Sequence, residues 1–195
     1  MVETITPVVY GGRNRTYWTA VIVHTLGATA SAAVLGLVLG GAGAILGAPW
    51  DRAGWWVLAA VAVVYALREG IGLPVPLPDL DRQVPEWWRT FYSPPIAALL
   101  YGLGLGVGFV TFLSFGTFAV VAAGSFVAGD PLLGALLCAP FGLARGLSVL
   151  AAVHNLGTQE DSGVRDVLEG MAMTRIPRYV NAAALAAIAT GVALT

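Results

Sequence analysis

The sequence contains no lysine, and all of its basic residues are arginines. A Schiff base on a lysine amine is therefore excluded, and with it retinal proteins and lysine-based enzymes. Cys138 is the single cysteine, which excludes an internal disulfide, a CxxC redox pair and a cysteine cluster for a metal. The two histidines have no supporting carboxylate beside them, so we expect no metal and no other cofactor, and we do not expect an enzyme.

Charge is also scarce. Only 11% of the residues are charged and 57% are hydrophobic, whereas a soluble domain has about 25% charged residues. This deficit indicates that most of the chain lies in a lipid bilayer. The formal net charge of −1 gives no sign of a nucleic-acid partner or of a polybasic lipid-binding patch. We therefore expect an all-α integral membrane protein.

Five apolar stretches are long enough to cross a bilayer as helices, because a crossing needs roughly 20 residues. These stretches are residues 17–48, 54–72, 95–128, 131–154 and 178–195. They predict one transmembrane domain, residues 17–195, built as a bundle of five helices behind a cytoplasmic tail at 1–16. Near 162–173, apolar residues recur at helical spacing between charged ones, which predicts a short amphipathic helix on the membrane surface.

The stretch 95–128 organises the prediction. It is longer than one crossing needs, it has no charge, and alternate glycines occupy positions 102–108. Hydroxyl side chains follow at Thr111, Ser114 and Thr117. This composition predicts a tightly packed transmembrane helix that is broken near its middle.

The arginines predict the orientation. With five crossings, the N-terminal tail and the loops 70–94 and 155–178 lie on one side with most of the arginines, and the other side holds only Arg52. The positive-inside rule then places the N-terminus in the cytoplasm and the C-terminus outside, in a multi-pass protein of the cell (inner) membrane. A second crossing within 95–128 would move the arginines of 155–178 outside, so we expect one crossing there.

Arg145 is the sharpest candidate for a functional residue. It lies near the middle of an apolar stretch, where a charge costs at least ~2.5–3.5 kcal/mol on insertion scales. One interpretation is a contact with an anion or substrate inside the bundle. The other is structural, in which Arg145 binds carbonyls freed by Pro140 or by the break in 95–128. The sequence leaves both open.

Other polar residues of the apolar stretches extend this candidate site. Thr111, Ser114 and Thr117 line a cavity at the helix break in one interpretation, and bond back to their own helix in the other. His24 is either a proton-relay group or a side chain bonded to a neighbouring helix. Arg68 and Glu69, at the end of the second stretch, are expected to form a pair that reaches out to the membrane surface.

Small residues and one proline have a structural interpretation. Glycine lets two helix backbones approach closely, and a proline inside a helix is expected to kink it. The packing positions are Gly102, Gly106, Gly142 and Gly146, and the kink is expected at Pro140.

Five segments, which cover nearly the whole chain, carry a resemblance to a known family. They are HTLGATASAAVLGLVLGGAGAILG (24–47), GWWVLAAVAVVYALREGIGLPVPLPDLDR (54–82), GLGVGFVTFLSFGTF (104–118), GALLCAPFGLARGLSVL (134–150) and RYVNAAALAAIATGVAL (178–194). In glycine placement and spacing they resemble the transmembrane region of the CcdA/DsbD family of thiol–disulfide and cytochrome c biogenesis proteins. The resemblance implies that family's fold without its chemistry. A family cysteine would fall between Thr111 and Ser114, where this chain has none, and Cys138 does not match. A thiol relay needs two thiols.

Three functional hypotheses follow. The first is transport or binding of a small solute or ion at a midplane site formed by Arg145, His24 and the hydroxyls of 111–117. The second is a non-catalytic membrane subunit or scaffold that packs against a second copy or a partner helix. The third is thiol redox chemistry that uses a partner's cysteines.

Overall fold

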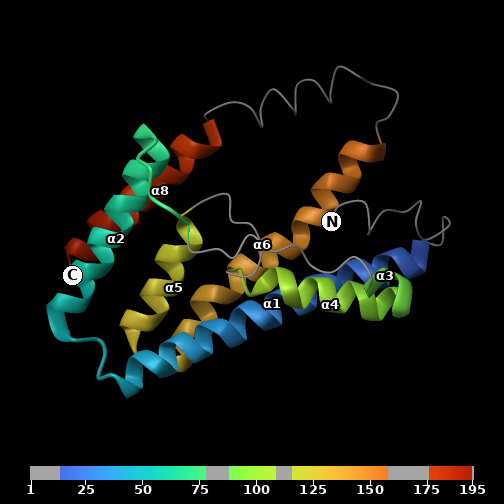
Figure 1. Ribbon diagram of the computed structural model, residues 1–195, viewed down its shortest axis with the longest axis horizontal. Helices are drawn as coiled ribbons and strands as arrows, with labels where there is room; N and C mark the ends of the chain where they lie inside the picture. Colours follow the sequence, from blue (N-terminus) through green and yellow to red (C-terminus); the bar gives the residue numbers. More distant parts are fainter. Residues whose placement is uncertain (1–13, 78–87, 109–115, 158–175, 195) are drawn as a thin grey trace.

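The computed structural model describes residues 14–77, 88–108, 116–157 and 176–194, and these residues form helices, turns and extended segments without a β-strand (Figure 1). The predicted all-α class is therefore confirmed for the described part of the chain. The helices are α1 (Asn14–Ile45), α2 (Asp51–Ile71), α3 (Trp88–Phe91), α4 (Pro94–Gly106), α5 (Thr117–Ala128), α6 (Pro131–Gly157) and α8 (Ile176–Ala193).

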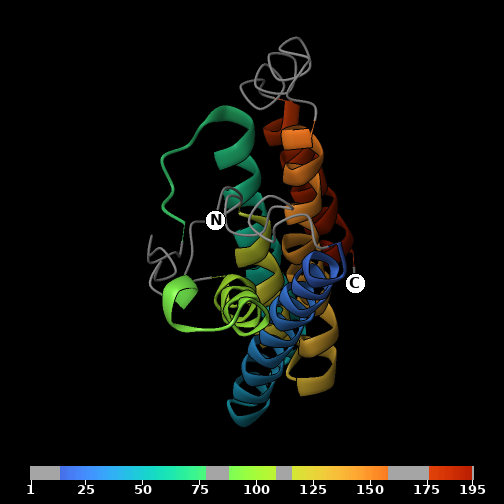
Figure 2. The ribbon, with the colours of Figure 1, turned by 90° about the vertical axis from the view of Figure 1, so that its right-hand side faces the viewer.

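The helices form two packed groups that α5 joins. α1 packs against α4 and α6, and α2 packs against α8, while α5 contacts α1, α2 and α6. Figures 1 and 2 show α2 and α8 side by side at one side of the molecule and α1 and α4 side by side at the other. Two core clusters correspond to these groups, one around Tyr17, Val21 and Val149 and one around Leu58 and Leu185.

The stretch 95–128 forms two helices rather than one. α4 ends at Gly106 and α5 begins at Thr117. α4 follows the first half of α1, since Ala98 packs near Tyr17 and Gly106 lies against the Ala28 carbonyl. α5 follows the far end of α1, where Gly43 lies against the Phe126 carbonyl. The two short helices together therefore run along the length of one long helix.

Local chemistry explains where α5 ends and α6 begins. Gly129 closes α5 with φ of 62°, a left-handed conformation that glycine adopts without steric cost. The next residue, Asp130, accepts a hydrogen bond from the Leu133 backbone N–H at 2.9 Å, and Pro131 occupies the first position of α6. A side-chain cap followed by proline is a strong helix start signal. Three consecutive residues therefore determine the turn between α5 and α6.

Glycines allow the backbones of α1 and α6 to touch. A Cβ atom at Gly36 would overlap the Gly134 carbonyl, and a Cβ atom at Gly142 would overlap the Ala28 carbonyl. Gly146 lies on the Thr25 backbone, and Gly102 on α4 lies against the His24 carbonyl of α1. Close backbone approach at small residues is the packing mode of helices in lipid, where apolar surface alone gives little driving force. Pro140 lies inside α6, which runs on as one helix.

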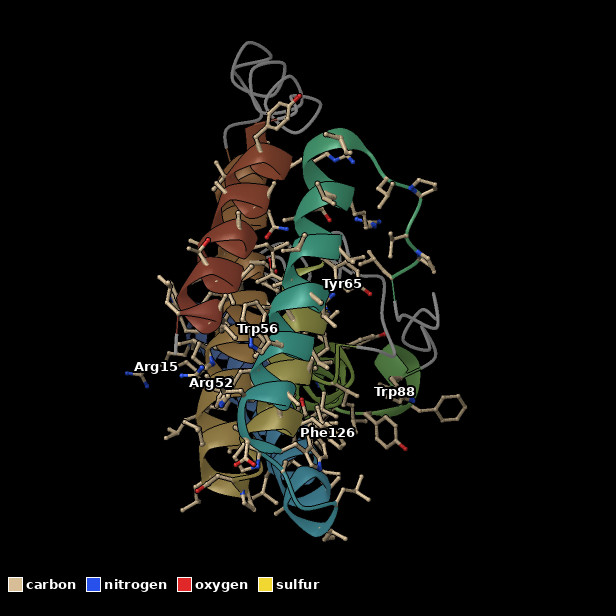
Figure 3. The ribbon with its side chains drawn as sticks, turned by 90° about the vertical axis from the view of Figure 1, so that its left-hand side faces the viewer. Arg15, Arg52, Trp56, Tyr65, Trp88 and Phe126 are labelled. Atoms are coloured by element: carbon tan, nitrogen blue, oxygen red, sulfur yellow. The ribbon has the colours of Figure 1, made fainter. Side chains whose placement is uncertain are left out.

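Among the residues that the structure describes, three helices are long and apolar enough to span a bilayer: Arg15–Ile45, Asp51–Ile71 and Pro131–Leu150. Large apolar side chains on them are exposed, for example Ile22 and Leu26. Trp56, which Figure 3 labels, is another. Their bounds differ from the expected 17–48, 54–72 and 131–154 by a few residues. The N-terminal residues 1–13 and the expected amphipathic helix at 162–173 lie outside the described residues.

Candidate functional site

The carboxylate of Glu69 is the centre of a buried polar cluster. Glu69 is only 2% exposed although it lies in the last turn of α2. Its Oε1 atom is 2.5 Å from Nη1 of Arg68 and accepts a hydrogen bond from the Gly116 backbone N–H at 3.2 Å. A buried carboxylate is costly unless it is paired and hydrogen-bonded, and Glu69 is both.

Arg178 connects α8 to the same cluster. Its Nε atom is 3.7 Å from Oε2 of Glu69, and its Nη2 donates to the Arg68 carbonyl at 3.2 Å. Arg68 is itself held in place, since its Nε donates to the Val75 carbonyl at 2.8 Å. The cluster therefore ties the end of α2, the start of α5 and the start of α8 together.

The sequence produces this arrangement through helix direction and one glycine. Side chains on a helix lean toward its N-terminus, so Glu69 extends from the last turn of α2 back into the bundle. Gly116 lies against the ring of Tyr65, where a Cβ atom would overlap the ring carbons (Tyr65 is labelled in Figure 3). The start of α5 can thus approach the carboxylate, and the partial positive charge of a helix N-terminus favours it.

A hydrogen bond between Thr117 and Asn181 extends the cluster. The Thr117 hydroxyl donates to Oδ1 of Asn181 on α8. Nδ2 of Asn181 is buried and has no hydrogen-bond partner among the described residues. Thr117 therefore bonds to another helix, which neither of its two sequence interpretations included. Thr111 and Ser114 lie outside the described residues.

A polar cavity of about 220 Å³ lies beside the cluster. Its walls come from the end of α2, the turn that follows it and the start of α8. The lining residues are Glu69, Gly70, Ile71, Gly72, Arg178 and Tyr179. Gly72 has φ of 77° and open space where a side chain would be, so the backbone itself forms one wall.

Arg145 reaches from α6 to the end of α4. Its Nη1 donates to the Leu105 carbonyl at 3.3 Å, in the last turn of α4. The guanidinium carbon also lies 5.5 Å from the ring centroid of Phe141, which stacks on Phe118 with ring centroids 4.1 Å apart. The contact with Leu105 is the kind that the structural interpretation of Arg145 requires, because the carbonyl belongs to a helix end at the break.

His24 lies in the contact between α1 and α4. It is 2% exposed, and its Nδ1 is 3.2 Å from the Ala98 carbonyl. Its Nε2 and the hydroxyl of Thr25 are buried and have no hydrogen-bond partner among the described residues. His24 and Arg145 thus contact α4, whereas Thr117 contacts α8, so these candidates do not share one set of contacts.

The thiol of Cys138 is buried inside the α5–α6 contact. Cys138 is 0% exposed, and its Sγ is 3.4 Å from Oγ of Ser125. Ser125 donates to the Val121 carbonyl at 2.9 Å. In the part of the chain that the structure describes, no group of three or more His, Cys, Asp or Glu residues is placed to hold a metal ion.

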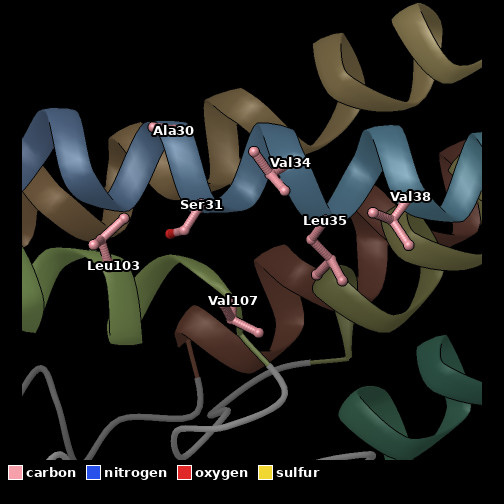
Figure 4. Close-up of a pocket in the computed structure, with 7 residues that line it drawn as sticks. All are labelled: Ala30, Ser31, Val34, Leu35, Val38, Leu103 and Val107. Atoms are coloured by element: carbon pink, nitrogen blue, oxygen red, sulfur yellow. The ribbon is translucent and has the colours of Figure 1, made fainter.

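An apolar groove of about 350 Å³ runs between α1 and α4 (Figure 4). Only one of its lining residues carries a polar side chain, the serine at position 31. The lining residues are Ala30, Ser31, Val34, Leu35, Val38, Leu103 and Val107. The groove lies along the outer face of the α1–α4 pair and is separate from the polar cavity at the end of α2.

Sequence reasoning missed the role of Glu69. The expectation that Arg68 and Glu69 form an outward-reaching pair is wrong for Glu69, whose side chain is 1% exposed. The physical reason is that the Arg68 guanidinium pairs with the carboxylate at 2.5 Å and the Gly116 N–H donates to it from inside the bundle, which together offset the cost of burying its charge. The available signal was the presence of arginine and asparagine at the start of the last apolar stretch, opposite an acid at the end of the second.

Comparison with known proteins gives relatives of one kind. The chain is 31% identical to the methylamine utilization protein MauF of Paracoccus versutus over 128 residues, which cover 65% of this chain and 47% of that protein. It is 31% identical over 141 residues to MauF of Methylophilus methylotrophus, covering 71% of this chain and 48% of the relative. The chain spans about half the length of the curated relatives it matches. No family model and no solved structure matches it.

The comparisons correct the resemblance to the CcdA/DsbD family. The relatives found are MauF proteins, so the identification from glycine placement and the spacing of the apolar stretches is wrong. Its physical basis was weak, because glycines at helical spacing are a general feature of packed helices in lipid. The expected link to cytochrome c biogenesis, which came from that resemblance, is withdrawn with it.

Proposed function

We propose that this chain is a membrane-embedded helical protein that crosses the bilayer five times. Support comes from the three long apolar helices and from the order of helix contacts. α1 and α6 run antiparallel, with Gly36 against Gly134 and Gly146 against Thr25. α4 and α5 follow successive parts of α1, so together they make one crossing. α8, antiparallel to α2, makes the last.

The proposed orientation keeps the N-terminus in the cytoplasm. Arg68 and Arg178 meet at one end of the α2–α8 pair, and both belong to the arginine-rich side of the sequence. The positive-inside rule assigns that end to the cytoplasm of the cell membrane. The exposed apolar side chains of α1, α2 and α6 then face the lipid bilayer, which is the proposed partner of these helix surfaces.

Within this membrane setting, the chain acts as an accessory protein in the utilization of methylamine or a related small amine. The observation that carries this function is the similarity to MauF proteins over 65–71% of the chain. The polar groups described above support a scaffold role, since Glu69, Arg145 and Thr117 bond to other helices of the same chain. A second copy or a membrane partner helix completes the proposed assembly.

The function is tested by deleting the gene from its native host. Growth with methylamine as the nitrogen or carbon source is compared with growth on ammonium and succinate. We expect the deletion strain to fail on methylamine alone and to recover when the wild-type gene is returned on a plasmid. Normal growth of the deletion strain on methylamine would reject the proposed function.

A second candidate function is binding or transport of a small solute. The polar cavity beside Glu69 and the guanidinium of Arg145 inside an apolar bundle favour it, with His24, Thr111, Ser114 and Thr117 as the other candidate contacts. Uptake of labelled methylamine by cells carrying Arg145→Leu is the test. Uptake equal to that of wild type, at equal protein level, would remove Arg145 from any transport site.

Thiol redox chemistry with a partner's cysteines is the least supported candidate. It requires that Cys138 reach a partner's thiol, and this side chain is fully enclosed between α5 and α6. Full function of Cys138→Ala in the methylamine growth assay would eliminate it.

A further inference from the structure

We propose that the polar cavity at the junction of α2 and α8 is a binding site for an anionic phosphate group, supplied by the headgroup of an acidic phospholipid. The same phosphate chemistry is available from free inorganic phosphate, and the experiment below separates the two sources. The assignment of lipid as the source rests on the membrane insertion proposed above.

The charges around the cavity leave a cation in excess. Among the described residues, the charged groups at the cavity are Arg68, Glu69 and Arg178, and Arg68 neutralises Glu69 through a contact of 2.5 Å. Arg178 approaches the same carboxylate only to 3.7 Å, which is too long for a hydrogen bond. The positive charge of Arg178 is therefore available to a ligand that carries negative charge.

Arg178 has the geometry and exposure that a phosphate ligand needs. A guanidinium has five N–H donors in a fixed planar fork. Arg178 donates from Nη2 to the Arg68 carbonyl, and its Nε lies 3.7 Å from the Glu69 carboxylate. Its side chain is 46% exposed, so an incoming group can reach it. Arginine binds phosphate with two parallel hydrogen bonds where a fork is presented.

The position of the cavity favours a lipid source. It lies at the end of α2 and the start of α8, beside exposed apolar side chains such as Ile71 and Val180. Tyr179 lines the cavity and is 50% exposed, and tyrosine is enriched at membrane–water interfaces. Basic pockets between transmembrane helices on the cytoplasmic side are recognised sites for anionic headgroups. A volume of about 220 Å³ accommodates a phosphate with part of its headgroup.

The test uses the full-length protein, purified and delipidated in mild detergent, with native mass spectrometry as the readout. Wild type, Arg178→Gln and the control Arg52→Gln are each titrated with phosphatidylglycerol, phosphatidylcholine and inorganic phosphate. Arg52 is also an exposed arginine but lies at the other end of α2 (Figure 3). Circular dichroism shows that each variant keeps its helix content, and Arg178→Lys provides a second variant that retains the charge.

We expect wild type to prefer phosphatidylglycerol over phosphatidylcholine, and Arg178→Gln to weaken phosphatidylglycerol binding about tenfold or more, the loss of one charge-assisted contact. Arg52→Gln should match wild type, and Arg178→Lys should fall between. Binding of inorganic phosphate but not of the lipid, lost in Arg178→Gln, would keep the phosphate site and reassign its source. Binding of both probes within twofold of wild type in Arg178→Gln, or no binding by wild type, would overturn the proposal.

Discussion

Replacing Glu69 with glutamine tests whether the buried carboxylate holds α2, α5 and α8 together. Glutamine keeps the size of the side chain and an acceptor for the Gly116 N–H, so the change isolates the charge. Arg68 would then lose a partner at 2.5 Å while its side chain is 22% exposed. Breaking a buried ion pair by removing one partner costs ~3–5 kcal/mol. Arg178, nearly half exposed and 3.7 Å away, adds little because exposed pairs are screened by solvent.

We therefore expect Glu69→Gln to lose about 3 kcal/mol of stability, the low end of that range, since water reaches Arg68. For a chain of this size about 1 kcal/mol corresponds to roughly 2–4 °C in Tm, so Tm should fall by roughly 6–12 °C. The measurement is thermal unfolding of the detergent-solubilised protein, followed by circular dichroism or by intrinsic tryptophan fluorescence.

Asp51→Asn is the matched control, because Asp51 is an exposed acid in the first turn of the same helix. Its removal should cost at most about 1 kcal/mol through the helix dipole. A double-mutant cycle with Arg68→Gln sharpens the result, since residues in one ion-pair network show coupling of about 0.5–3 kcal/mol. If the Tm of Glu69→Gln equals that of Asp51→Asn, or if the losses of stability from the Glu69 and Arg68 substitutions are additive, the ion pair does not hold α2, α5 and α8 together.

Two further predictions concern helix packing. Gly36→Ala should lower the Tm of the same preparation by an amount equivalent to about 1–3 kcal/mol, because the new methyl group overlaps the Gly134 carbonyl. Gly41→Ala is the control and should leave the Tm unchanged, because a Cβ atom there has ordinary contact distances. Equal melting temperatures for the two variants would contradict the close packing of α1 on α6. Cys138 should resist maleimide labelling in the folded protein and react fully after unfolding in SDS, because its side chain is 0% exposed. Rapid labelling of the folded protein would show that the α5–α6 contact opens.

Many of the helices could be predicted from the sequence, because apolar runs and the residues that start and stop a helix are local features of the chain. The turn at Gly129, Asp130 and Pro131 has a glycine, a capping acid and a proline in consecutive positions, and each acts as its type predicts. The interruption of 95–128 could also be expected, since the run is longer than one crossing needs and its alternating glycines have a low helix propensity.

The polar cluster could not be predicted, because its members are far apart in the sequence. Gly116 donates to Glu69 across 47 positions, and Thr117 bonds to Asn181 across 64. Periodicity shows which face of a helix is apolar, but it does not show which two helices meet. For the same reason the sequence could not show that His24 and Arg145 both contact α4 whereas Thr117 bonds to α8.

The charged residues inside this apolar chain share a physical task at the interruption between α4 and α5. A helix that ends inside an apolar bundle leaves carbonyl groups at its C-terminus and N–H groups at its N-terminus without partners, and such groups cost several kcal/mol each in lipid. Arg145 donates to the Leu105 carbonyl at the end of α4, and Glu69 accepts from the Gly116 N–H at the start of α5. Each charge has the sign that the helix dipole favours at that end. Positive and negative side chains from α6 and α2 thus stabilise the two ends of one broken helix, which accounts for both charges without requiring a bound solute at either.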